Sequence, residues 1–99
     1  MRTITQGHVY ELDNFDGEDV QTLRFIHKEN QDGKLVTVEN GTTNEQVIAV
    51  LIDRLQFLDT IMPSDFNKVA IQHLDEALLS LQNRTADREQ RAVEGTPAE

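Results

Sequence analysis

The sequence predicts an α+β protein in which a small N-terminal antiparallel β-sheet precedes a two-helix antiparallel hairpin, assembled as a homo-oligomer. Two patterns predict this class: β-rich runs and turn residues fill the first forty positions, and apolar residues then recur at helical spacing. The length of 99 residues fits one domain. We expect a single domain over 1–99, with a β-rich segment at about 7–39, a helical hairpin at about 43–92 and a tail at 93–99.

Alternating side chains and turn residues predict the N-terminal strands. The run "HVYEL" alternates Val9 and Glu11 against Tyr10 and Leu12, and the turn-rich "DNFDGED" follows it. Two further runs, "VQTLRFIHKE" and "KLVTVE", flank the segment Asn30–Gly33, whose composition is typical of a hairpin turn. We expect two or three strands.

Two capping signals mark the helices. Gly41 ends the β-rich part, and Thr43 with Gln46, or alternatively Thr42 with Glu45, fits a capping box. The first helix has a main apolar face formed by Val47, Val50, Leu51, Leu55, Leu58, Ile61 and Met62. Ile48 and Ile52 lie on a second face of this helix. A hairpin beside a small sheet would leave that second face uncovered, which predicts burial against another copy of the chain.

Pro63 cannot continue the first helix, and Ser64 is a strong N-cap for the second, helped by the negative charge of Asp65. The apolar positions of the second helix are Ala70, Ile71, Leu74, Ala77, Leu78 and Leu81. The short connection between the helices predicts an antiparallel pair.

Composition excludes several functions. The net charge of −9 argues against binding DNA or RNA polymers, which need a broad basic surface. The absence of cysteine excludes disulfides and thiolate metal sites. The apolar runs are much shorter than the roughly 18 residues of a membrane span, and we expect no signal peptide. We therefore expect a cytoplasmic protein with no membrane partner.

Arginines follow the apolar face of the second helix. The positions Leu74, Ala77 and Leu81 continue as Arg84, Arg88 and Arg91. The planar guanidinium group binds phosphate through two parallel hydrogen bonds. Taken alone, this pattern favours a different interpretation: Arg84 and Arg88 form surface ion pairs with Asp87, Glu89, Asp53 or Asp59.

Other chemistry-bearing residues give weaker signals. The histidines, His8, His27 and His73, match no metal-site spacing, so we expect neither a metal nor a cofactor. No nucleophile or acid–base pair indicates catalysis. Tyr10 and Lys28 could reach a ligand from the sheet, but packing and solvent exposure are favoured for them. Arg54 could join a pocket or form an interface pair with Asp59 or Glu76, and we favour the pair.

Three segments together resemble a known family: "NGTTNEQVIAVLIDRLQFL", "PSDFNKVAIQHLDEALLSL" and "NRTADREQRAVEGT". They are similar to the helical hairpin of the phage anti-Thoeris and anti-CBASS sponges, and the preceding strands favour the anti-Thoeris branch. The resemblance covers roughly residues 40–96. It implies a non-enzymatic hexamer that binds a cyclic nucleotide immune signal in the infected bacterial cytoplasm. That signal is a cyclic ADP-ribose isomer such as gcADPR, and related members also take cyclic di- or trinucleotides.

The resemblance also implies the site residues. Phe57 would offer its ring to a base, Asn67 would bond a ribose or base edge, and Arg84 and Arg88 would bind the pyrophosphate, with Arg91 continuing their row. The sequence departs from the family at Ala92, where Gly is usual, at Pro97, where His is frequent, and at Lys68 and the preceding "SDF". The first two departures weaken the implication of a second, cyclic-oligonucleotide site near the tail.

Two other functions are compatible with the composition. The net charge of −9 suggests a protein that mimics nucleic acid or binds and inhibits a host defence enzyme directly. A mimic needs carboxylates spread over one face, whereas Asp13, Asp16, Glu18 and Asp19 cluster in a turn. A hydrolase that degrades the signal ranks last, since neither a metal site nor a nucleophile–base pair is evident in the sequence.

Overall fold

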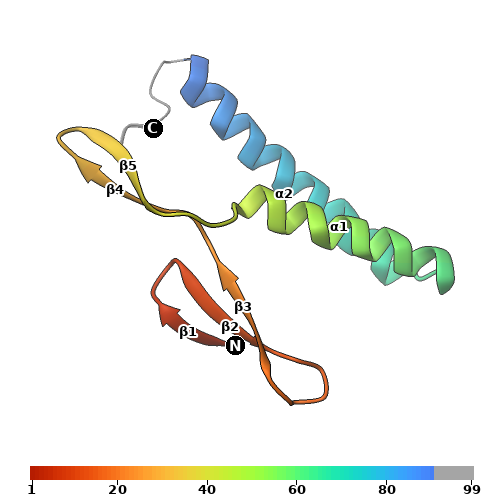
Figure 1. Ribbon diagram of the computed structural model, residues 1–99. Helices are drawn as coiled ribbons and strands as arrows, with labels where there is room; N and C mark the ends of the chain where they lie inside the picture. The colour runs from red at the N-terminus through yellow and green to blue at the C-terminus, as the bar shows by residue number, and fades with distance from the viewer. Residues whose placement is uncertain (91–99) are drawn as a thin grey trace. The chain divides into compact units, whose positions relative to one another are not determined.

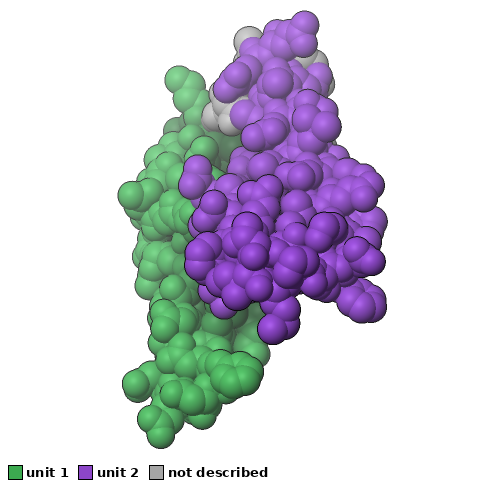
Figure 2. All heavy atoms as spheres, turned by 90° about the vertical axis from the view of Figure 1, so that its right-hand side faces the viewer, with its two compact units in different colours: residues 1–43 green, residues 44–99 purple. Residues whose placement is uncertain are grey.

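The computed structural model describes residues 1–90, which form five strands followed by two helices (Figure 1). The elements are β1 (Arg2–Thr5), β2 (Val9–Asp13), β3 (Val20–Arg24), β4 (His27–Gln31), β5 (Lys34–Glu39), α1 (Asn44–Ile61) and α2 (Asp65–Gln90). The predicted α+β class, with strands before helices, is confirmed. The chain divides into a sheet unit, residues 1–43, and a helical unit, residues 44–99, coloured separately in Figure 2. The single domain over 1–99 stays a prediction.

The first sheet of the sheet unit has the order β1-β2-β3, with both pairs antiparallel. Its register pairs Arg2 with Glu11 and Val9 with Arg24. Val9 is buried and marks the small core of this sheet. Within the β2–β3 turn, the Asn14 side-chain amide donates to the Glu18 carbonyl at 2.8 Å.

The second sheet is the antiparallel hairpin β4–β5. Its two-residue turn consists of Asp32 (φ 55°) and Gly33 (φ 81°), and the Gly33 N–H donates to the Asn30 side chain at 3.1 Å. Two positive φ values are what a type I′ turn requires, and they match the right-handed twist of the strands. The hairpin predicted at Asn30–Gly33 is confirmed.

The number of strands was predicted incorrectly, because the run 20–29 does not continue as one strand. At its middle, the Phe25 N–H donates to the His8 carbonyl at 2.7 Å and the Ile26 N–H donates to the Thr42 carbonyl at 2.9 Å. These bonds to two different segments end β3 and start β4 in another sheet. The N-terminal strand, β1, also begins before the β-rich segment that we expected.

Both helix starts agree with the capping signals. α1 begins at Asn44, which places Thr43 at the N-cap position, the first of the two predicted frames. The Ser64 hydroxyl accepts a hydrogen bond from the Phe66 N–H at 3.2 Å at the start of α2. The two helices pack as an antiparallel hairpin (Figure 1). Neither is long and apolar enough, over the described part of the chain, to cross a membrane.

The helical unit has almost no core of its own. Within residues 44–90, Ile52 alone is buried, and Ile48 is half-buried. The prediction that these two isoleucines form the uncovered face was therefore wrong. The exposed apolar side chains of α1 are Val50, Leu51, Phe57 and Ile61. Ile48 and Ile52 are one helical turn apart and form a single ridge, which explains why they are buried together.

Candidate functional site

One row along α2 has polar residues at both ends and leucines between them. Asn67, Leu74, Leu81 and Arg88 follow one another at seven-residue steps, so they share one side of the helix, and all four are half-buried. The prediction that the inward-facing stripe of this helix becomes cationic agrees with the half-buried positions of Leu74, Leu81 and Arg88. The neighbouring row does not face inward as predicted, because Ala77 and Arg84 are both exposed. A small side chain such as Ala77 covers little of the surface beside it, so that row stays open to solvent.

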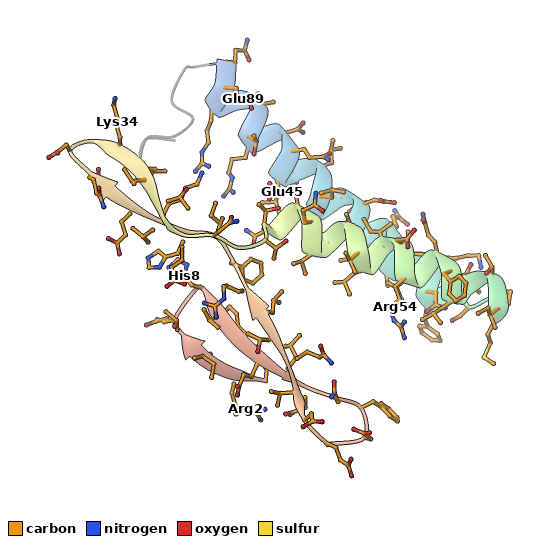
Figure 3. All side chains as sticks on the ribbon, viewed as in Figure 1. Arg2, His8, Lys34, Glu45, Arg54 and Glu89 are labelled. Atoms are coloured by element: carbon orange, nitrogen blue, oxygen red, sulfur yellow. The ribbon has the colours of Figure 1, made fainter. Side chains whose placement is uncertain are left out.

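The two guanidinium groups near the end of α2 have no acidic partner in residues 1–90. Neither Arg84 nor Arg88 forms an ion pair with Asp53, Asp59, Asp87 or Glu89 there, so the surface ion pairs expected from the local pattern do not form. The Arg88 Nε atom is buried and makes no hydrogen bond to the described residues. A buried guanidinium donor without a partner is costly, and an anion would remove that cost. Figure 3 labels Glu89 at this end of α2.

Phe57 and Asn67 lie on either side of the connection between the helices. Phe57 is 61% exposed on the penultimate turn of α1, and Asn67 is half-buried on the first turn of α2. Between them, the Asp59 carboxylate accepts hydrogen bonds from the Ser64 N–H and the Lys68 ammonium, both at 2.9 Å. The Ser64 bond is the main cause that lowers the pKa of Asp59, followed by Lys68, with a smaller contribution from Asn67. This network fixes the geometry of the helix connection beside Phe57 and Asn67.

A single hairpin does not bring the predicted site residues together. Asn67 and Arg84 are separated by 17 positions on one continuous helix. At about 1.5 Å per residue, this is about 25 Å along its axis. Phe57 and Asn67 therefore lie at one end of the hairpin, and the arginines lie at the other. Arg91 lies outside the described residues, as do Ala92 and Pro97.

The side chains that gave weaker functional signals, Tyr10, Lys28 and the histidines, show no arrangement that indicates a binding site within residues 1–90. Tyr10 packs edge-on against Phe25, with ring centroids 6.0 Å apart, as its packing interpretation predicted, and Lys28 is exposed. The rings of His8 and His27 stack 3.8 Å apart, which the sequence did not indicate, since the junction of the two sheets brings them together. No group of acidic or histidine side chains suited to a metal ion occurs among residues 1–90.

Arg54 was expected to form an interface ion pair with Asp59 or Glu76 rather than to join a pocket. It is exposed on α1 and forms no ion pair with the described residues. Its two proposed partners are engaged elsewhere: Asp59 binds Lys68, and Glu76 faces His73 at 3.8 Å and accepts a hydrogen bond from Gln72. The residue belongs to the same exposed face as Phe57, which is three positions further along α1.

Comparisons with known proteins identify a similar phage protein. No family model matches the chain. A relative from Bacillus phage SBSphiJ7, named "Thoeris anti-defense 1", is 46% identical over 79 residues, which cover 65% of this chain and 54% of the relative. The chain therefore spans about half the length of the curated relative that it matches. This similarity confirms the resemblance to the anti-Thoeris family that the helical hairpin motifs indicated.

Proposed function

We propose that this protein is a phage anti-Thoeris protein that binds a cyclic ADP-ribose isomer such as gcADPR and sequesters it in the cytoplasm of the infected bacterium. The observation that carries the proposal is the pair Arg84 and Arg88. Both lack an acidic partner within the described residues, although acidic residues outnumber basic residues two to one in the whole chain. The two arginines are four positions apart on α2, about one helical turn, so both guanidinium groups can reach one anion. The anti-defence name of the similar phage protein agrees with this role.

The chemistry of these side chains fits a small phosphate-containing nucleotide. Each guanidinium can donate two parallel hydrogen bonds to a phosphate, so two arginines suit a pyrophosphate. The exposed ring of Phe57 offers a flat apolar surface to a base. The Asn67 amide can both donate to and accept from a ribose or base edge. None of these groups provides a nucleophile activated by a base, and we propose binding without degradation.

The separation along α2 requires that a pocket take its two halves from two chains. The row Asn67, Leu74, Leu81 and Arg88 is complementary to itself when reversed. An antiparallel second copy would place Asn67 opposite Arg88 and Leu74 opposite Leu81, as isologous interfaces do. The exposed apolar side chains of α1 would gain cover in the same assembly. We propose such two-chain pockets within a homo-oligomer, and a hexamer as the assembly that the family resemblance implies.

The proposed contacts are strong enough for sequestration. A sponge should bind its signal at nanomolar concentration or lower, which corresponds to about −12 kcal/mol. A hydrogen bond to a charged group contributes about 1.5–3 kcal/mol. Two arginines with several such bonds, one amide and one stacked base reach this range when rigid helices hold them in place.

Isothermal titration calorimetry with gcADPR and other cyclic ADP-ribose isomers tests the proposal. We expect tight binding with a fixed number of ligands per chain, and heating the complex should release the ligand chemically intact. Arg84→Ala combined with Arg88→Ala should abolish binding. Weak or absent binding of every isomer would refute the proposal, and release of a cleaved product would indicate a hydrolase. Cyclic di- and trinucleotides in the same titration test whether a second ligand class binds.

The β2–β3 turn favours a second candidate function, direct inhibition of a host defence enzyme. Phe15 at this turn is fully exposed, and Asp16, Glu18 and Asp19 follow it in the sequence. An exposed aromatic side chain among carboxylates could insert into an apolar pocket with a basic rim. Phage protection that survives loss of Arg84 and Arg88 but not Phe15→Ser would favour this candidate over sequestration.

A further inference from the structure

The face of α1 that carries Phe57 contains a cation, Arg54, that has no ion-pair partner among residues 1–90. Val50, Arg54, Phe57 and Ile61 follow one another at three- or four-residue steps, so they form one exposed stripe, named here the α1 stripe. Arg54 extends from the side of α1 in Figure 3. The neighbours of Arg54 one turn away are apolar: Val50, Leu51, Phe57 and Leu58. Ion pairs between helical residues three or four positions apart stabilise a helix, and no carboxylate occupies those positions around Arg54.

The helical unit is acidic, so an arginine without an ion pair among its described residues, such as Arg54, is unexpected there. Over residues 44–90, acidic side chains are twice as numerous as basic ones. One of the four cations, Lys68, is already neutralised by Asp59 at 2.9 Å. The three cations without an ion pair in this range are Arg54, Arg84 and Arg88. Two of these three are the proposed phosphate ligands.

We propose that Arg54 is a third ligand-contacting arginine, and that it binds a phosphate oxygen of the nucleotide whose base stacks on Phe57. This inference rests on the proposed function. Side chains three positions apart on a helix have Cβ atoms about 5–6 Å apart, so the Arg54 guanidinium reaches groups attached to a base on the Phe57 ring. The pyrophosphate is then bound by Arg84 and Arg88 of one chain and by Arg54 of the chain that supplies Phe57.

The cost of burying a charge in the assembly also favours a phosphate-binding role for Arg54. A second copy that covers the α1 stripe would remove Arg54 from water, and a desolvated cation needs a counter-charge. The two carboxylates suggested by the sequence, Asp59 and Glu76, already have partners in their own chain. A bound phosphate supplies the missing charge. It also explains why a strongly acidic protein can attract a dianionic ligand to this end of the hairpin.

Titration of the full chain with gcADPR tests the inference. The variants are Arg54→Gln, which removes the charge, and Arg54→Lys, which keeps it. Lys34→Gln is the matched control, because it removes an exposed charge from the first residue of β5, outside the helical unit. We expect Arg54→Gln to weaken binding about 10- to 100-fold, the range of one charge-assisted contact, and Lys34→Gln to change it less than about twofold. Arg54→Lys should retain part of the affinity.

Salt and mass measurements separate the alternatives. Raising the ionic strength should reduce the difference in gcADPR affinity between the wild-type protein and Arg54→Gln, because salt screens the contact between Arg54 and the phosphate. Light scattering should give the same assembly mass for both. Equal affinity of the two proteins for gcADPR would overturn the inference and leave the proposed function standing. Loss of assembly in Arg54→Gln, restored by Arg54→Lys, would overturn it in favour of an ion pair between chains. Absence of binding by the wild-type protein would overturn both proposals.

Discussion

Arg88 combines an unfavourable structural position with a proposed binding role. Its Nε atom is buried without a hydrogen-bond partner among the described residues, while the side chain extends the row that begins at Asn67. Groups placed for a ligand often cost stability in the unbound protein. The opposite effects of one substitution on stability and on binding can therefore reveal such a residue.

Arg88→Met is expected to separate these two effects. Methionine keeps the unbranched stem but removes the unpartnered donor, whose burial costs about 1–3 kcal/mol. The free energy of unfolding, measured by urea denaturation, should stay unchanged or rise. The affinity for gcADPR should fall at least tenfold. Glu89→Gln, at the exposed neighbouring position, serves as the control and should alter neither quantity appreciably. A large loss of stability in Arg88→Met would instead assign Arg88 a structural role.

Asp59 predicts a pH dependence of stability. The Ser64 N–H and the Lys68 ammonium lower the pKa of its carboxyl below the ordinary value. The folded state therefore binds this proton more weakly than the unfolded state, whose aspartate has a pKa of about 3.9. The stabilising contribution is complete above that value and is lost as pH falls through the lowered pKa. Asp59→Asn should reduce Tm at pH 7, and this reduction should shrink as the pH falls below about 3.9. A Tm difference that stays constant as the pH falls below that value would contradict this expectation.

At the scale of elements, the sheet junction depends on a close approach at Gly41. A Cβ atom there would lie 2.5 Å from the Phe25 carbonyl carbon and 2.7 Å from the Arg24 oxygen. Both are backbone atoms, which cannot move aside as a flexible side chain can. The neighbouring Thr42 exchanges hydrogen bonds at 2.9 Å with Arg24 and Ile26, so the clash would disturb the link that separates β3 from β4.

Gly41→Ala should destabilise the protein by about 1–3 kcal/mol, as overpacking does. Amide hydrogen exchange of Ile26 and Thr42 should accelerate more than exchange within α1. Gly33→Asn is the control, because nothing lies within 4 Å of a Cβ there and asparagine tolerates the positive φ of 81°. Unchanged exchange at both amides in Gly41→Ala would show that the backbone accommodates the methyl group.

The elements that local chemistry determines were predictable from the sequence. The Asp32–Gly33 turn, the Ser64 cap and the leucine row of α2 all follow from residue types and spacing within a few positions. The break of the run 20–29 was not predictable, because it depends on hydrogen bonds to His8 and Thr42, which are distant in sequence. The face of α1 that is buried was also missed. Its two apolar faces are similar in composition, and only the packing of the folded chain distinguishes them.

The same contrast applies to the candidate site. The arginines and Asn67 could be placed on one helix from their spacing, because a helical row is a local property. Their separation by about 25 Å follows only once α2 is seen to continue unbroken from Asp65 to Gln90. The absence of an ion pair at Arg54 within residues 1–90 could not be predicted, since it depends on Lys68 and Gln72 binding the competing carboxylates.

At the scale of the whole molecule, each proposed pocket is formed by two chains of the homo-oligomer. If each pocket takes Phe57 and Asn67 from one chain and Arg84 and Arg88 from another, then two defective variants should complement each other. The first variant carries Asn67→Ala with Phe57→Ala, and the second carries Arg84→Ala with Arg88→Ala. Each variant alone lacks one half of every pocket, so neither should bind gcADPR.

Co-expression of the two variants with different tags, followed by purification through both tags, yields mixed assemblies. A pocket is intact when its aromatic half comes from the second variant and its arginine half comes from the first. Random mixing in a symmetric assembly makes about one quarter of the pockets intact. Calorimetry should therefore show wild-type affinity with about one quarter of the wild-type stoichiometry. A pocket built within one chain would remain defective in every mixture, so absence of binding would exclude the two-chain arrangement even if the wild-type protein binds the signal.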